Sequence, residues 1–177
     1  MNAGKNFEND FKLSVDKEVY YERLKDPAQS FIPSENLRFS PSNPYDCFLF
    51  YYPNLFTFEL KSTGQNSITF YDEKFVVKGK KQSFMIKKNQ IKGLLKSSKH
   101  KGIISGLILN FRKTNHTYFL HINDFVNMVK KIEKKSFNEQ DVIKNNGHKI
   151  KQTLKRVNYR YHIMDFISEL QEKYNQK

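Results

Sequence analysis

The stretch that decides the fold runs from Asn43 to Phe70 and reads NPYDCFLFYYPNLFTFELKSTGQNSITF. Two strand-like runs lie within it, Asp46–Tyr52 and Leu55–Ser62, and a Pro-Asn pair between them supplies a turn. The first run is dense in aromatic side chains, and the second alternates apolar with polar residues. We therefore expect two neighbouring strands joined by a tight turn.

Three charged residues of these strands form a candidate metal site. Side chains alternate sides along a strand, so Glu59 and Lys61 share one face, and Asp46 opens the neighbouring strand. The two carboxylates can approach each other across the sheet, and carboxylate oxygens with open coordination positions suit Mg²⁺, with Mn²⁺ as a possible substitute. A bound ion would polarise a phosphate, and Lys61 would orient or help to deprotonate the attacking water.

The order of these residues resembles the pattern of restriction-endonuclease-type nucleases, in which P-D is followed by a variable gap and D/E-x-K. Here the pattern reads Pro44-Tyr45-Asp46 and Glu59-Leu60-Lys61. The triplet alone has another interpretation, because E-x-K is a common tripeptide and an outward-facing, salt-bridged pair is its usual role on a strand. The nuclease interpretation therefore depends on the rest of the chain.

The remaining chain predicts further helices and strands. Apolar residues at i, i+4 spacing predict a helix within Gly4–Leu24, and the proline-rich segment Asp26–Pro44 predicts an ordered surface connection. Ser67–Phe70 is expected to extend the sheet. Later helices or strands are predicted at Ile86–Ser97, Gly102–Arg112, Thr117–His121, Asn123–Lys134 and Tyr161–Tyr174. This order predicts an α/β fold in a single domain over residues 1–177, with a restriction-endonuclease-like core in which helices flank a central mixed β-sheet.

The charge of the chain favours a polyanionic partner. Thirty-one Lys and Arg residues against eighteen Asp and Glu residues give a net charge of +13 and a pI near 9.7. Such an excess attracts nucleic acid, although an AT-rich genome also raises the lysine content. Only five of the basic residues are arginine. Because lysine suits phosphate contact and arginine suits base edges, the composition favours recognition of DNA backbone and shape over recognition of sequence.

Across most of its length the chain resembles the RecU-type Holliday junction resolvases. Asn43–Phe70 resembles the catalytic segment of that family, in which an S-D-Y-like strand precedes F-E-x-K-x-T and a small polar stretch. Glu8 stands at the glutamate of an early-helix G-K-x-x-E motif, and Gln90 stands at the glutamine of an H-Q pair on the next helix. Gly147–Asp165 resembles the basic C-terminal segment of the family.

The resemblance implies an Mg²⁺-dependent, structure-selective endodeoxyribonuclease that resolves four-way DNA junctions in recombination and repair. Asp46 and Glu59, assisted by Glu8, would hold the metal, while Lys61 would activate water and Gln90 would position it. A homodimer is implied, because two symmetric nicks need two sites related by a two-fold axis. DNA contacts are expected at the following residues: Thr63, Lys78, Lys80, Lys81, Lys87, Lys88, Lys155, Arg156 and Arg160.

The chain departs from the family in three places. Asn89 replaces the histidine of the H-Q pair, and the Asp26–Pro44 connection is too short for the protruding stalk of the family. Glu73–Phe84 is an additional stretch before the helix that carries Gln90. These differences indicate a divergent relative, of a kind that a phage could encode, whose grip on a junction differs.

Composition argues against other classes of protein. Cys47 is the single cysteine, so no intramolecular disulfide and no cysteine metal cluster can form. No apolar run approaches the length of a membrane span, and the N-terminus lacks the apolar core of a signal peptide. We expect no membrane partner and a cytoplasmic location in a bacterial cell or phage-infected host.

Two alternatives stay open. The same core could belong to a sequence-specific or a repair endonuclease, against which the excess of lysine over arginine argues mildly. The chain could instead be a non-catalytic DNA-binding module. The intact set of Asp46, Glu59 and Lys61 argues against that alternative, because an inactive site has no need of it.

Overall fold

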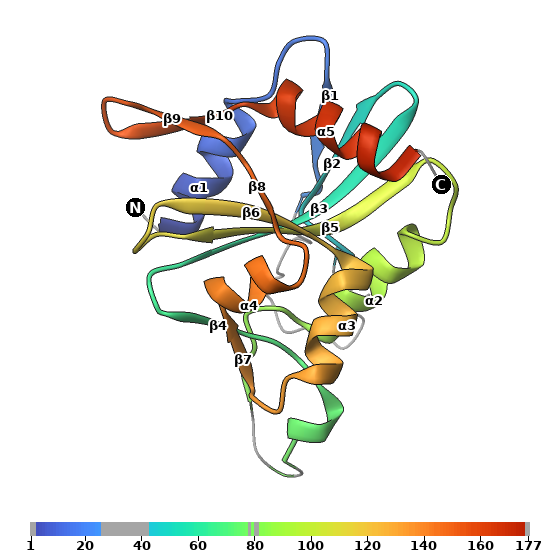
Figure 1. The fold of residues 1–177 in the computed structure, drawn as a ribbon, viewed down its shortest axis with the longest axis vertical. Coiled ribbons are helices and arrows are strands. Elements are labelled where there is room, and N and C mark those ends of the chain that lie inside the picture. The colour runs from blue at the N-terminus through green and yellow to red at the C-terminus, as the bar shows by residue number, and fades with distance from the viewer. Residues whose placement is uncertain (1–2, 26–42, 78, 80–81, 176–177) are drawn as a thin grey trace, which may run out of the picture.

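A computed structural model describes residues 3–25, 43–77, 79 and 82–175. A six-stranded mixed sheet lies at its centre, in the order β1-β2-β3-β5-β6-β8 (Figure 1). The strands are β1 (Tyr20–Arg23), β2 (Cys47–Tyr51), β3 (Asn54–Thr63), β5 (Ile103–Phe111), β6 (His116–His121) and β8 (His148–Lys149). β3 and β5 are parallel, and the other neighbours in this sheet are antiparallel.

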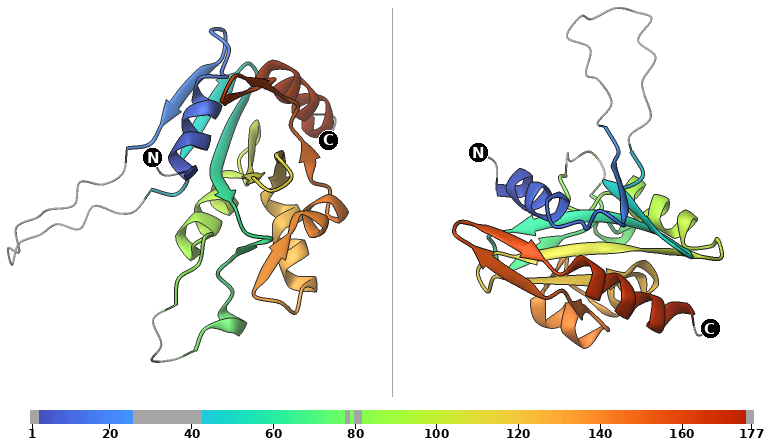
Figure 2. Two further views of the ribbon diagram at one scale, coloured as in Figure 1. Left: turned by 90° about the vertical axis from the view of Figure 1, so that its left-hand side faces the viewer. Right: turned by 90° about the horizontal axis from the view of Figure 1, so that it is seen from above.

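Helices cover both faces of the central sheet (Figures 1 and 2). One face carries α1 (Ala3–Lys12) and α5 (Ile163–Asn175), and the other carries α2 (Lys88–Ser97) and α3 (Ile122–Lys131). Each face buries its own apolar cluster: Phe58 and Phe166 belong to the first, and Phe70 and Phe125 to the second. Burial on two faces explains why β5 is apolar along nearly its whole length.

Smaller elements lie around this core. β9 (Gln152–Lys155) and β10 (Asn158–Tyr161) form a hairpin beside α1 (Figure 1). β4 (Ser67–Thr69) pairs with β7 (Ser136–Asn138), next to α4 (Glu139–Lys144). The 3₁₀-helix η1 (Glu73–Phe75) follows β4.

The prediction of a mixed sheet flanked by helices is confirmed, but the expected extent of the first helix is wrong. α1 ends at Lys12, where the Ser14 hydroxyl donates to the Asp10 carbonyl (2.5 Å) and so offers the backbone a partner outside the regular helix. The chain then returns as β1. Its two aromatic residues, Tyr20 and Tyr21, suit a strand and pair with β2.

A second correction concerns Ser67–Phe70, which does not extend the central sheet. β4 pairs with β7 in a separate two-stranded sheet. The chain turns away after β3, where the backbone N–H of Gln65 donates to the Thr63 hydroxyl (2.9 Å). This local turn directs the segment toward α4 instead of alongside β3.

Some predictions fall outside the described residues. These are most of the Asp26–Pro44 connection and the DNA contacts proposed at Lys78, Lys80 and Lys81. Within the part of the chain that is described, no helix is both long and apolar enough to cross a membrane.

Candidate active site

Glu59 lies at the centre of the candidate site. It stands in the middle of β3, and its side chain is completely buried (0% exposed). The Lys61 ammonium and the Gln90 side-chain amide both donate to the same oxygen, Glu59 Oε1. The prediction that Glu59 and Lys61 share a face is confirmed by this contact.

Asp46 is held against the same strand by two hydrogen bonds. Its backbone N–H donates to the Phe58 carbonyl (3.0 Å), and its Oδ2 accepts from the backbone N–H of Leu60 (2.8 Å). The carboxyl group of Asp46 therefore lies beside that of Glu59, close enough to affect its protonation. The expected approach of two carboxylates across neighbouring strands is confirmed.

Gln90 connects the start of α2 to β3. Its Oε1 accepts from the backbone N–H of Lys87 (2.8 Å), which is the reach-back bond of a capping box. Its Nε2 donates to Glu59. Both ends of the amide are thus occupied, and the side chain fixes the helix relative to the buried carboxyl group.

Electrostatics around Glu59 favour a cation. Burial raises its pKa, the Lys61 ammonium opposes this effect, and the nearby Asp46 carboxylate adds to it, so that the resulting pKa is about 8. Its second oxygen, Oε2, is buried and has no hydrogen-bond partner among the described residues. Because a buried acceptor without a partner is costly, a divalent cation between Glu59 and Asp46 would satisfy this oxygen, and carboxylate oxygens are the ligands that Mg²⁺ prefers. The residues present therefore fit the metal.

α2 lies unusually close to the segment that leads into Asp46. A Cβ added at Gly93 would stand 2.5 Å from Pro44 Cβ and 2.6 Å from the Pro44 carbonyl oxygen, so only glycine permits this approach. One turn earlier, Asn89 Nδ2 donates to the Asn43 carbonyl (3.2 Å). Asn89, which stands at the histidine of the RecU pattern, thus joins α2 to the segment before β2.

Glu8 does not lie with the residues around the Glu59 carboxyl group. Its carboxylate forms an ion pair with Arg23 on β1 (2.7 Å). Within the described ranges no set of three His, Cys, Asp or Glu side chains is arranged to hold a metal, so Glu8 does not join Asp46 and Glu59 here.

The predicted DNA contacts that fall within the described residues lie in three places. Thr63 ends β3, is 3% exposed, and its hydroxyl serves the local turn. Lys87 and Lys88 stand at the start of α2, where Lys88 pairs with Glu73 (2.7 Å). Lys155, Arg156 and Arg160 all belong to the β9–β10 hairpin, and the first two are exposed at its tip.

Sequence patterns missed the residues that hold this hairpin in place. Asp10 and Ser14, near the end of α1, are buried, and they accept from the backbone N–H groups of Tyr159 (3.0 Å) and Tyr161 (2.9 Å). From the sequence alone, a polar residue in an amphipathic helix is expected to face solvent. Only the contact with β10, about 150 residues away, reveals its partner.

Comparison with known proteins gives three similarities. Residues 50–166 match the family model of Recombination protein U (RecU). The SPbeta prophage-derived uncharacterized protein YotM of Bacillus subtilis (strain 168) is 33% identical over 185 residues, which cover 97% of this chain and 88% of that protein. The structure resembles that of Hjc, a Holliday junction resolvase from the archaeal hyperthermophile Archaeoglobus fulgidus, with a TM-score of 0.51 and 14% identity over 82% of this chain and 95% of that one. The last similarity shows a shared fold.

Proposed function

Because the chain belongs to the Recombination protein U family, we propose that it is an Mg²⁺-dependent endodeoxyribonuclease that resolves four-way DNA junctions. We propose further that it acts as a homodimer, making paired symmetric nicks in the cytoplasm of a bacterial cell or phage-infected host. The prophage origin of its Bacillus subtilis relative and the shared fold of the archaeal resolvase support this setting and this substrate.

One observation carries the proposal: Asp46, Lys61 and Gln90 meet around the buried Glu59 carboxyl group, whose Oε2 has no hydrogen-bond partner among the described residues. Asp46 and Glu59 would hold Mg²⁺, which would polarise the scissile phosphate and stabilise the charge that develops during hydrolysis. Glu8 remains a predicted further ligand, which would have to leave Arg23 to take part.

The side chains around the carboxyl groups would prepare the attacking water. The Lys61 ammonium has three donors, of which one is directed at Glu59. The others can hold a water molecule or a phosphate oxygen in place. Gln90 fixes the Glu59 carboxylate and α2 in one arrangement, which keeps the distance between the water site and the carboxyl groups constant.

Basic residues outside the site would supply most of the affinity. The exposed Lys87, Lys155 and Arg156, with Lys88 and Arg160, are the described candidates for phosphate contact. Such contacts release counterions, so we expect binding to weaken steeply as salt increases. Thr63 and the lysines at 78, 80 and 81 remain predicted contacts.

Synthetic DNA tests this proposal. Wild type and Asp46→Asn are incubated with a labelled four-way junction, a linear duplex and a single strand, in Mg²⁺ or EDTA. We expect Mg²⁺-dependent nicks in the junction alone, absent from Asp46→Asn. Cleavage of linear duplex at a fixed sequence would indicate a restriction or repair endonuclease of the same fold. Tight junction binding without cleavage in Mg²⁺ or Mn²⁺ would indicate a non-catalytic binding module.

A further inference from the structure

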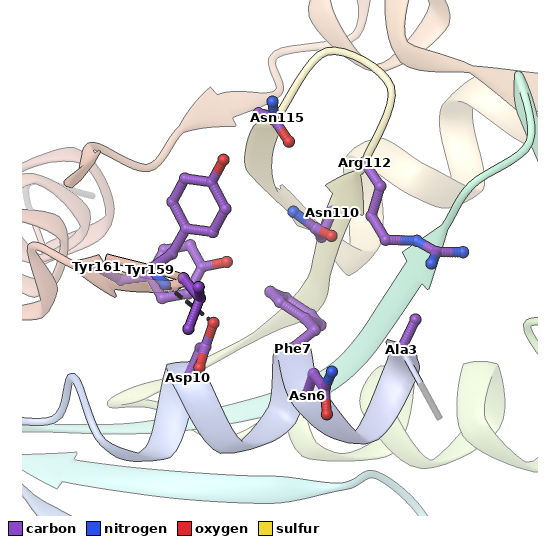
Figure 3. A pocket seen from close by; sticks show the side chains of 10 residues that line it. Ala3, Asn6, Phe7, Asp10, Asn110, Arg112, Asn115, Tyr159 and Tyr161 are labelled. Atoms are coloured by element: carbon purple, nitrogen blue, oxygen red, sulfur yellow. Dashed lines mark hydrogen bonds between the residues drawn. The ribbon is translucent and has the colours of Figure 1, made fainter. Parts of the chain in front are cut away.

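A pocket of about 210 Å³ lies on the α1 side of the central sheet, at the end where β3 and β5 finish. Its walls come from the first turns of α1, from the end of β5 with the turn after it, and from β10. Figure 3 shows these side chains around one space, among them Asn6, Phe7, Asn110, Arg112, Asn115 and Tyr159.

The walls of this pocket are fixed by hydrogen bonds that are buried or partly buried. Asn110 accepts from the Ser62 hydroxyl (2.8 Å) and donates to the Thr117 hydroxyl (3.0 Å). On the opposite wall, Asp10 holds the backbone N–H of Tyr159 (3.0 Å). The pocket therefore exists without a ligand and needs little rearrangement to receive one.

The third wall depends on a left-handed residue. Asn115 has a φ of 55° in the turn between β5 and β6, and its carbonyl accepts from the Gln152 side chain (2.6 Å). Asparagine tolerates this conformation better than most residues, but glycine would adopt it more easily. The Asn115 amide therefore stands at a backbone position that glycine would also serve.

The chemistry of these walls fits a nucleotide. The exposed carboxamides of Asn6 and Asn115 offer both donors and acceptors, which is what the edge of a nucleobase requires, while the buried amide of Asn110 is held by Ser62 and Thr117 and shapes the wall. Tyr159 is partly buried and lines the pocket, where its ring can supply a face on which an unpaired base stacks. The volume is below the roughly 300 Å³ of the smallest drug-sized sites, so the pocket suits one base and not two.

Charge divides the pocket into two ends. Arg112 is exposed, forms no ion pair within the described chain, and lies against Gly64, where an added Cβ would be 2.6 Å from its Nη2. Its guanidinium suits a phosphate. Asp10, the acidic residue of the lining, stands at the hairpin end, where its carboxylate would repel a phosphate.

The pocket and the candidate active site share the strand β3 but lie on opposite faces of the sheet. Ser62, which holds Asn110, directly follows Lys61 on β3 and faces the other side of the sheet. Gly64 directly follows the end of β3, and Arg112, which lies against it, directly follows the end of the neighbouring strand β5. At the rim, Val157 is 86% exposed at the tip of the hairpin, an apolar side chain of the kind that separates stacked bases.

From these contacts we infer that the pocket binds one unpaired nucleotide of branched DNA. The base lies among Asn6, Asn110 and Asn115 against Tyr159, and its phosphate lies at Arg112. The inference rests on the proposed function for the identity of the DNA. It adds a site that holds a branch-point nucleotide beside the strand that carries Glu59 and Lys61.

Binding to paired probes tests the inference. Two duplexes carry a single-nucleotide bulge that is either a thymidine or an abasic residue, so they differ in one base and not in phosphates. Affinity is measured in EDTA, which prevents hydrolysis. Wild type is expected to bind the thymidine bulge about fivefold or more tightly, the factor expected for stacking of one base. Equal binding of the two probes by wild type would overturn the inference.

Variants then assign the preference to the pocket. Asn115→Gly keeps the left-handed backbone while removing the amide, and Tyr159→Leu removes the ring. Both variants are expected to bind the two probes with equal affinity, whereas Arg112→Gln should lower the affinity for both probes by the same factor. Tyr20→Leu, on β1, and Lys101→Gln, in the turn before β5, change exposed residues outside the pocket; they are the controls and should retain the preference. Retention of the preference by both pocket variants would overturn the inference.

A separate cleavage assay in Mg²⁺ keeps this test apart from the proposed function. Cleavage of junctions without discrimination between the two bulges would support the nuclease proposal and overturn the inference about the pocket. Discrimination between the bulges without cleavage of junctions would support the inference about the pocket and overturn the nuclease proposal.

Discussion

The Gln90 side chain on α2 donates to the buried Glu59 carboxylate on β3, and this bond joins a helix terminus to the candidate metal site. The same side chain closes the capping box of α2. A change at Gln90 therefore affects two structures together: the orientation of the carboxyl group and the start of the helix.

Replacing Gln90 with alanine should lower activity more than stability. Partners that orient a metal ligand are typically worth about 10–100-fold in metal affinity or activity, and we expect a loss of that size in single-turnover cleavage of a junction. Lys92→Ala, at an exposed position on the same helix, is the control. Equal cleavage rates for the two variants would contradict the positioning role of Gln90.

The raised pKa of Glu59 predicts how stability depends on pH. Its pKa is raised from 4.5 to about 8, so without metal its contribution to the free energy of unfolding is complete below pH 4.5 and is lost as the pH rises through about 8. In EDTA the Tm of wild type should fall more between pH 5 and pH 8.5 than that of Glu59→Gln. A parallel decline in both proteins would show that Glu59 titrates normally.

Metal should reverse that trend. Mg²⁺ binds the ionised carboxylate, so it should raise the Tm of wild type at pH 8.5, and at pH 6.5 its binding should release a proton. Calorimetry in two buffers of different ionisation enthalpy measures the proton release. Glu59→Gln should show neither effect, and a proton count near zero for wild type would contradict the assignment.

Gly93→Ala tests the close approach of α2 to Pro44. At an exposed position of a helix this change stabilises by about 1 kcal/mol, because alanine is the better helix former. Here the added Cβ would overlap Pro44. We therefore expect the free energy of unfolding to fall by about 1–3 kcal/mol, as for overpacking of a core. Urea denaturation measures it, with Lys96→Ala as the control on the same helix. A more stable Gly93→Ala protein would show that α2 can move away at no cost.

Arg156→Gly separates stability from DNA binding. Arg156 has a φ of 57° at the tip of the hairpin, a conformation that disfavours residues with a Cβ by about 1–2 kcal/mol. We expect the glycine variant to be as stable as wild type or up to about 1 kcal/mol more stable, yet to bind DNA more weakly. The slope of log K against log salt should become less steep by about 0.9, the value for one lost phosphate contact. An unchanged slope would remove Arg156 from the DNA contacts.

Local patterns in the sequence were sufficient for part of the candidate site. Alternation along β3 predicted that Glu59 and Lys61 share a face, because side-chain direction on a strand depends only on neighbouring residues. The burial of Glu59 and its bond to Gln90 depend on the pairing of β3 with β5 and on where α2 lies over them. The resemblance to RecU-type resolvases pointed to Gln90, but no pattern in this chain alone gives its partner.

The first segment shows why the remaining fold could not be predicted. Phe7, Phe11, Val15 and Val19 keep a helical spacing, but the helix stops after Lys12. A strand partner, β2, competes for the residues that follow, and pairing with a distant strand is not encoded in local spacing. The same limit applies to Asp10, whose role depends on β10 at the other end of the chain.

A plasmid that extrudes a cruciform provides the most direct test of the central claim. Paired symmetric nicks across the junction, made within the lifetime of one complex, convert the supercoiled plasmid to a linear product. The account predicts a linear product that requires Mg²⁺, disappears with Asp46→Asn and is absent from a plasmid without the cruciform. Supercoiled plasmid left intact by wild type in Mg²⁺ would contradict the nuclease, and nicked circles alone would contradict the paired action of two sites.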